Sequence, residues 1–231
     1  VIYREKPSVE KVFEDRCRAL GVPLHKADFD SIRLLRHSLE GQTFSCGRFK
    51  ELKLPLLGEH QLHNAAVVLC TADVLRARGW NITDAHIREG LACVQWPGRF
   101  ELMREHPLFI IDGGHNPQCI EALVKNIEDY LAGRPHTVLT GVLGDKDFHC
   151  MYQNVAPYAR EFITVTPGNP RALDAQKLAE YLQQFGKPVT PCRQVADGVR
   201  LAVAHAGADG VVLCYGSLYM IGEIKAALDA L

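Results

Sequence analysis

A regular alternation in the second half of the chain, from about residue 100 onward, constrains the fold most strongly. Short apolar runs of strand length alternate there with stretches of helical periodicity. The strands are predicted at 108–111, 137–140, 162–165 and 211–215, and the helices at 117–132, 147–159, 172–185, 195–206 and 217–230. Continuous apolar strands separated by amphipathic helices indicate a mostly parallel sheet that is covered on both faces. We therefore expect a Rossmann-like, three-layer α/β/α domain over residues 96–231.

Residues 1–95 show a less regular pattern. It predicts a strand at 1–3, a helix from Ser8 to about Leu20 with Ser8 as its N-cap, and strand-like pieces at 43–46 and 52–56. A long helix is expected over about 61–78, and a shorter one after an N-cap at Thr83. No self-sufficient fold emerges from this half. We interpret it as the end of a domain that begins upstream.

Charge, hydropathy and cysteine spacing exclude several classes of partner. Of 231 residues, 26 are Lys or Arg and 27 are Asp or Glu, so there is no basic surplus to favour nucleic acid. No apolar run approaches the roughly 18 residues of a membrane span, and no secretory signal pattern is present. The eight cysteines form no C-x-x-C pair, so we expect reduced thiols, a cytoplasmic protein and no metal ligands.

The clearest candidate site follows the strand at 108–111, in the sequence D-G-G-H-N-P at 112–117. Two glycines allow a sharp turn, Asn116 suits an N-cap and Pro117 suits the first helical position. Asp112 and His115 are equally compatible with simple turn roles and with a carboxylate and an imidazole at a ligand site. In open α/β sheets, ligands bind at the carboxyl ends of the strands.

Two further polar loops follow strands. The sequence G-D-K-D at 144–147 places Lys146 between two carboxylates, and Asp147 capping the next helix is the more ordinary interpretation. Ser217 follows the strand at 211–215 and either binds an anion or only caps its own helix. Because parallel strands end at one edge of a sheet, we expect Asp112, Lys146 and Ser217 to share a cleft.

Arg99 and a pair of histidines are the remaining candidates. Arg99 lies in a Pro- and Gly-containing junction between the halves, where it either grips phosphate or pairs with an acidic neighbour. His60 and His63 lack the i, i+4 spacing of a helical metal site. The only Gly-Lys pair, at 186–187, is followed by Pro188, so the chain contains no P-loop for a nucleoside triphosphate.

Five motifs in a fixed order carry a family resemblance. They are G-E-H-Q-L-x-N-A-A (58–66), W-P-G-R-F-E (96–101), D-G-G-H-N-P (112–117), G-D-K-D (144–147) and G-S-L-Y-M-I-G-E-I (216–224). Together they resemble the folylpolyglutamate synthase and dihydrofolate synthase family of the Mur ligases. Members join glutamate to a folate or pteroate carboxylate, which ATP first converts to an acyl phosphate. The family fold is a P-loop ATP-binding domain followed by a smaller Rossmann-like domain.

The resemblance implies roles for six residues. Asn64 matches a residue that contacts the nucleotide base, Arg99 one that reaches the ATP phosphates, and Asp112 one that holds the ribose and the hinge. His115 and Ser217 are implied to lie near the reacting carboxylate and the incoming glutamate, and Lys146 is a weaker candidate for that region. The implied substrates are ATP, glutamate and a folate or pteroate, with Mg²⁺, in a monomeric enzyme.

The chain departs from the family pattern in two respects. Gly114 stands where the family usually has Ala, and the P-loop, the Mg²⁺ ligands and most of the pterin-binding surface belong to a segment expected before Val1. Residues 1–95 are thus expected to be the tail of the ATP-binding domain, and the 231 residues alone to be inactive. Two alternatives stay open: another Mur-type amino-acid ligase, and a non-catalytic α/β module that binds a small anion or amino acid.

Overall fold

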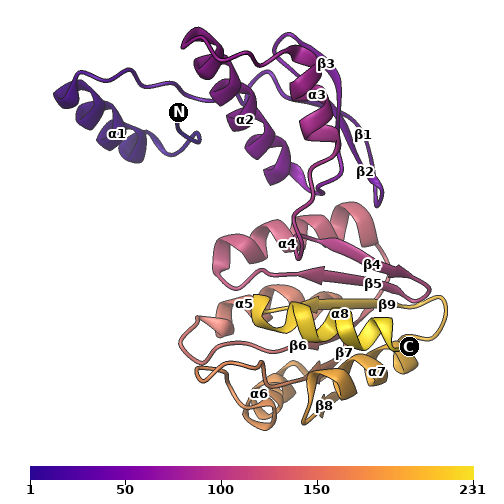
Figure 1. The fold of residues 1–231 in the computed structure, drawn as a ribbon. Coiled ribbons are helices and arrows are strands. Elements are labelled where there is room, and N and C mark those ends of the chain that lie inside the picture. Colours follow the sequence, from indigo (N-terminus) through magenta and orange to yellow (C-terminus); the bar gives the residue numbers. More distant parts are fainter. The chain divides into compact units, whose positions relative to one another are not determined.

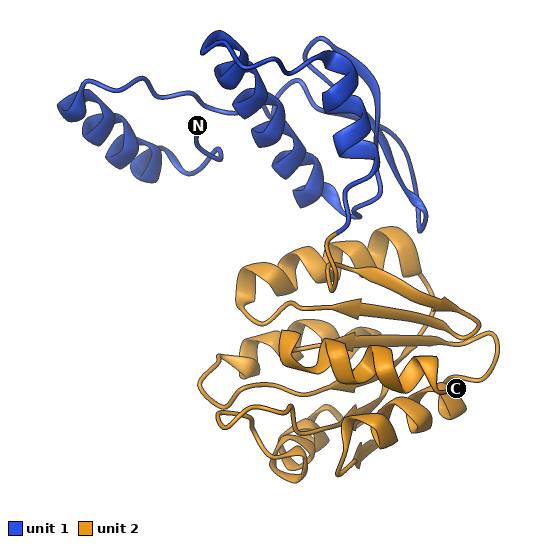
Figure 2. Cartoon of the chain, in the orientation of Figure 1, with its two compact units in different colours: residues 1–95 blue, residues 96–231 orange.

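A computed structural model describes all residues, 1–231, and the chain divides into two compact units. Unit 1 comprises residues 1–95 and unit 2 comprises residues 96–231 (Figure 2). No helix is both long and apolar enough to cross a membrane. Each unit has its own secondary structure and its own buried core, so each is described by itself.

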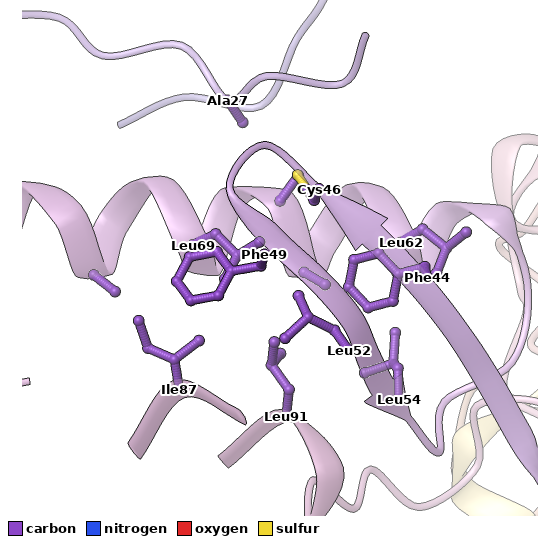
Figure 3. Close-up of a cluster of buried hydrophobic side chains, with 13 residues drawn as sticks. Ala27, Phe44, Cys46, Phe49, Leu52, Leu54, Leu62, Leu69, Ile87 and Leu91 are labelled. Carbon is purple, nitrogen blue, oxygen red and sulfur yellow. The ribbon is translucent and has the colours of Figure 1, made fainter. Parts of the chain in front are cut away.

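Unit 1 combines three helices with a three-stranded antiparallel sheet of order β1-β2-β3. Its elements are α1 (Pro7–Leu20), β1 (Arg33–Ser38), β2 (Gly41–Cys46), β3 (Phe49–Leu54), α2 (Glu59–Ala77) and α3 (Asp84–Ala92). Phe44 and Phe49 of the sheet pack with Leu62 and Leu69 of α2, and α3 closes the core with Ile87 (Figure 3). This half therefore has a hydrophobic core that the sequence pattern did not predict.

Two expectations for unit 1 were wrong in detail, and one strand was not predicted. The strand at 1–3 is a single bridge between Ile2 and Lys26. Helix α1 begins at Pro7, with Lys6 as its N-cap, so Ser8 lies inside the helix and does not cap it. Strand β1 was missed because all six of its residues are exposed and leave no alternating pattern. The cap at Thr83 is confirmed, since its side chain accepts a hydrogen bond from the His86 N–H.

Unit 2 is built on a six-stranded sheet of order β4-β5-β9-β6-β7-β8 (Figure 1). Only β4 is antiparallel to its neighbour; the other pairings are parallel. The strands are β4 (Glu101–Glu105), β5 (Leu108–Asp112), β6 (His136–Thr140), β7 (Ala159–Thr164), β8 (Val189–Pro191) and β9 (Val211–Tyr215). The helices are α4 (Pro117–Leu131), α5 (Phe148–Val155), α6 (Ala175–Leu182), α7 (Val195–Ala206) and α8 (Ile221–Asp229), with 3₁₀ turns η1 (Ala156–Tyr158), η2 (Gln183–Phe185) and η3 (Leu218–Met220).

Helices cover both faces of this sheet, which confirms the three-layer α/β fold. Phe109, Leu139 and Val212 point to the face covered by α7 and α8, which lie in front of the sheet in Figure 1. On the other face, Tyr152 of α5 packs edge-on against Phe162, with α4 beside α5. All four predicted strands are confirmed, but the helix expected at 172–185 begins only at Ala175, after an N-cap at Asp174.

Candidate functional site

The parallel register brings the three polar loops to one edge of the sheet. Asp112 at the end of β5 pairs with Tyr215 at the end of β9, and Tyr215 pairs with Thr140 at the end of β6. The loop carrying Ser217 therefore lies between the loops carrying His115 and Lys146. The last two loops of this row touch: a Cβ on Gly216 would lie 2.6 Å from the carbonyl oxygen of Gly141. We call this edge the strand-exit edge.

Asp112 serves the backbone around it. Its Oδ1 accepts the Gly114 N–H at 2.6 Å and its Oδ2 accepts the Phe100 N–H at 3.0 Å. Burial raises the pKa of this carboxyl, although the two backbone donors and the charges of Arg99 and His115 act in the opposite direction. Asp112 thus holds both its own turn and the segment before β4 in place. The turn role is one of the two that the sequence allowed.

The segment at 98–101 has a strained backbone held by hydrogen bonds. Gly98 has φ = 74° and Phe100 has φ = 44°, a region in which a residue with a side chain costs about 1–3 kcal/mol. The Gly98 N–H donates to Oε2 of Glu101 at 2.7 Å, and the Gly98 carbonyl accepts the Gly113 N–H at 2.8 Å. Phe100 is buried. These contacts explain most of the motif at 96–101.

Arg99 is the one residue of this segment whose side chain is unused by the fold. Its guanidinium makes no hydrogen bond and no direct ion pair with the protein, although its charge acts on the carboxylate of Asp112. Arg99 is half-buried as a residue, and a guanidinium is the group that binds phosphate in a fork. The site therefore offers a free cation on a fixed backbone.

His115 has a defined tautomer. Its Nδ1 lies 2.9 Å from the Gly113 carbonyl oxygen, which can only accept, so Nδ1 carries the proton. In the neutral ring, Nε2 is then left with a lone pair and can take a proton from a ligand. Asn116 caps α4 through the Cys119 N–H, and Pro117 is the first helical residue, as predicted.

The Lys146 loop is more open. Asp145 pairs with Arg171 at 2.7 Å, and Asp147 caps α5 by accepting the Cys150 N–H, as the ordinary interpretation predicted. Lys146 itself is half-buried, and its ammonium makes no ion pair. The loop thus contributes one uncommitted cation.

Ser217 is buried between these loops. Its Oγ accepts the Tyr219 N–H at 3.3 Å, so it caps the η3 turn. Helix α8 starts only at Ile221, four residues later than the helix expected at 217–230. A role for the hydroxyl in holding an anion stays a prediction.

Asn64 belongs to unit 1, unlike the other five candidates. It is exposed on α2, and its Nδ2 donates to Oε1 of Gln61 at 3.0 Å, which leaves its Oδ1 as an acceptor. Nearby, His63 stacks on Phe29 with ring centroids 4.4 Å apart, so His63 is engaged in packing.

Two cavities lie away from the strand-exit edge. One of about 360 Å³ is in unit 1, between α2 and the turn at Gly47 and Arg48. The other, of about 390 Å³, is in unit 2, where α4 ends and Pro157 and Tyr158 precede β7. Neither is lined by any of the six candidate residues, and the shared cleft stays a prediction.

Sequence comparison identifies the domain to which the strand-exit edge belongs. Residues 98–218, just over half of the chain, match the family described as Mur ligase, glutamate ligase domain. The chain belongs to this Mur ligase family. The Mur ligase part of the resemblance inferred from the five motifs is thereby confirmed.

Relatives of known name refine this assignment. Folylpolyglutamate synthase of Lacticaseibacillus casei is 39% identical over 129 residues, which are 55% of this chain and 30% of that enzyme. The structure of Mycobacterium tuberculosis folylpolyglutamate synthase complexed with ADP and AMPPCP matches with a TM-score of 0.84 and 29% identity, over 97% of this chain and 54% of that one. A Yersinia pestis bifunctional folylpolyglutamate synthase/dihydrofolate synthase, complexed with AMPPNP and Mn ion, matches with a TM-score of 0.74 and 25% identity, over 95% and 50%. The chain thus spans at most about half the length of these relatives.

The structure adds one ion pair near these residues that the sequence did not single out. Glu101 was quoted within a motif but given no role, and Lys225 lies one residue beyond the last motif. Their side chains meet at 3.0 Å. No sequence signal pairs residues 124 positions apart.

Proposed function

We propose that residues 1–231 form part of an ATP-dependent ligase that joins glutamate to a folate or to dihydropteroate. The observation that carries this proposal is a set of three uncommitted groups in a Mur ligase domain: the Arg99 guanidinium just before β4, the open Nε2 of His115 after β5 and the Lys146 ammonium after β6. The proposal is also supported by the similar synthases whose structures were solved in complex with ADP, AMPPCP or AMPPNP. Unit 1 would be the tail of the ATP-binding domain and unit 2 the glutamate-ligase domain.

The reaction has two steps. A carboxylate oxygen of the folate or pteroate attacks the γ-phosphorus of ATP, and ADP leaves to give an acyl phosphate. The amine of glutamate then attacks the acyl carbon, inorganic phosphate leaves, and a base takes the proton from the nitrogen. Arg99 would neutralise charge on the transferring phosphoryl group, and Asn64 would contact the base of ATP.

The residues near the acyl group would act on the second step. Nε2 of His115 is the group able to accept the amine proton, while Lys146 and the loop at Ser217 would hold carboxylates of glutamate. No three His, Cys, Asp or Glu side chains lie close enough together to hold a metal ion. These residues would therefore not form the Mg²⁺ site. We further propose a cytoplasmic monomer that uses Mg²⁺, with no nucleic-acid or membrane partner.

The test is a substrate panel on the product of the complete open reading frame that contains residues 1–231. ADP release should require both glutamate and tetrahydrofolate or dihydropteroate, and the product should carry one added glutamate by mass spectrometry. Turnover with a muramyl nucleotide instead would assign a different Mur-type ligase. ADP release with neither acceptor, or no turnover with any member of the panel, would overturn the proposal.

A further inference from the structure

The ion pair between Lys225 and Glu101 joins the last helix to the segment that carries Arg99. Lys225 is the fifth residue of α8, and its Nζ lies 3.0 Å from Oε1 of Glu101, at the start of β4. Both side chains are half-buried. Helix α8 follows the η3 turn that Ser217 caps, so the pair links the motif at 96–101 to the helix next to the Ser217 loop.

Glu101 uses its second oxygen on the backbone. While Oε1 accepts from Lys225, Oε2 accepts the Gly98 N–H at 2.7 Å. A rotation of the carboxylate away from Lys225 would also disturb this second bond. The position of Lys225 therefore influences the peptide immediately before Arg99.

Contacts on both sides of Arg99 leave little freedom to its backbone. Gly98 packs against Leu218 of η3 and Ile221, the first residue of α8, so closely that an added Cβ would overlap Ile221. The Phe100 N–H, on the other side, donates to Asp112. The Arg99 guanidinium makes no hydrogen bond of its own, so its direction depends chiefly on this fixed backbone.

We infer that Lys225 is a positioning residue that acts through Glu101 and the 98–100 backbone to aim Arg99. The inference rests on the proposed function, in which Arg99 meets the phosphates of ATP. Lys225 itself needs no contact with substrate. A partly exposed ion pair contributes little to stability, so its effect on folding and its effect on Arg99 are separable.

The test measures kinetics and amide exchange in the product of the complete open reading frame. Lys225→Met removes the charge with little change in length and should lower kcat/KM for ATP about tenfold, well within the ~100-fold that a 1 Å misplacement can cost. Lys225→Arg should restore most of the loss. Hydrogen–deuterium exchange of the peptide covering 96–101 should rise in Lys225→Met, because the Gly98 N–H loses protection.

A double-mutant cycle separates positioning from general stability. If Lys225 acts through Arg99, then adding Lys225→Met to Arg99→Ala should lower kcat/KM for ATP less than twofold further. Lys125→Met is the matched control, since Lys125 meets Asp129 at the same 3.0 Å on α4, and it should leave the kinetics unchanged.

The outcomes distinguish the two claims. An active wild type in which Lys225→Met and Lys125→Met behave alike would overturn the positioning role alone. So would equal losses from Lys225→Met in the wild-type and Arg99→Ala backgrounds. An inactive wild type would overturn the proposed function, and the inference with it.

Discussion

The loops after β5 and β6 carry similar residues but use them differently. After β5, the carboxylate of Asp112 is surrounded by protein and accepts two backbone N–H groups, which tie the loop to the 98–101 segment. After β6, Asp145 and Asp147 serve an exposed ion pair and a helix cap. A charged residue after a strand is therefore not enough to identify a functional site. The two loops differ in whether the carboxylate bonds to several backbone groups or lies in an exposed ion pair or helix cap.

The largest effect is expected at Gly216, in the tightly packed part of the strand-exit edge. Gly216 has φ = 118°, and an added Cβ would meet the Gly141 backbone at 2.6 Å, so Gly216→Ala should lower the free energy of unfolding by about 3 kcal/mol. Gly144→Ala in the β6 loop is the control, because its nearest neighbour would be 3.7 Å away. Chemical denaturation checks both. Equal stabilities of the two variants would contradict the close packing of Gly216 against Gly141.

Asp112→Asn should be the next most damaging change. An amide nitrogen would face a backbone N–H that the carboxylate now accepts, so we expect a loss of about 1–3 kcal/mol in the free energy of unfolding.

The raised pKa of Asp112 adds a pH dependence of known sign. A carboxyl whose pKa is higher in the folded state stabilises the fold while protonated, and this contribution is lost as the pH rises from about 4 through the folded-state pKa. The difference in unfolding free energy, wild type minus Asp112→Asn, should therefore shrink over that range. A difference that grows with pH would show that the pKa is lowered instead.

Arg99→Ala should separate activity from folding. Because the guanidinium makes no bond within the protein, the free energy of unfolding should change by only about 0.5 kcal/mol. In the complete polypeptide, kcat/KM for ATP should fall at least tenfold. Loss of stability with unchanged ATP kinetics would place Arg99 among the structural residues.

The smallest effect is expected from Arg171→Ala, in the loop after β7, whose side chain pairs with Asp145 of the β6 loop. It removes the exposed pair with Asp145, which is worth roughly 0–1 kcal/mol. High salt should abolish even that difference, because exposed pairs are screened. If Arg171→Ala lowered the free energy of unfolding as much as Asp112→Asn does, the two loops would not differ in the way described.

The sheet of unit 2 could be predicted because its central strands are continuous apolar runs. Its edge strands could not be predicted in this way. Strand β4 contains three charged residues and no fully buried one, and β8 has only three residues, the last of which is Pro191. In unit 1, the exposed β1 shows no pattern for the same reason. A strand can be predicted from sequence when burial on one or both of its faces determines the residue types.

The candidate site was predictable only where it is local. Asp112, His115, Asn116 and Pro117 lie in one strand exit, and their turn and capping roles followed from spacing. The Glu101–Lys225 pair joins distant parts of the chain, and the free state of Arg99 depends on what surrounds it. Such features require the fold.

The most direct test of the account is the turnover of His115→Ala in the complete polypeptide, with ATP, glutamate and the preferred folate. Its Nδ1 makes one bond, to the Gly113 carbonyl, so folding should weaken by no more than about 1 kcal/mol. We predict that kcat falls about 100-fold or more, while His149→Ala, at an exposed position on α5, retains normal turnover. Near-normal turnover of a folded His115→Ala would contradict the assignment of the strand-exit edge as the place where glutamate is joined.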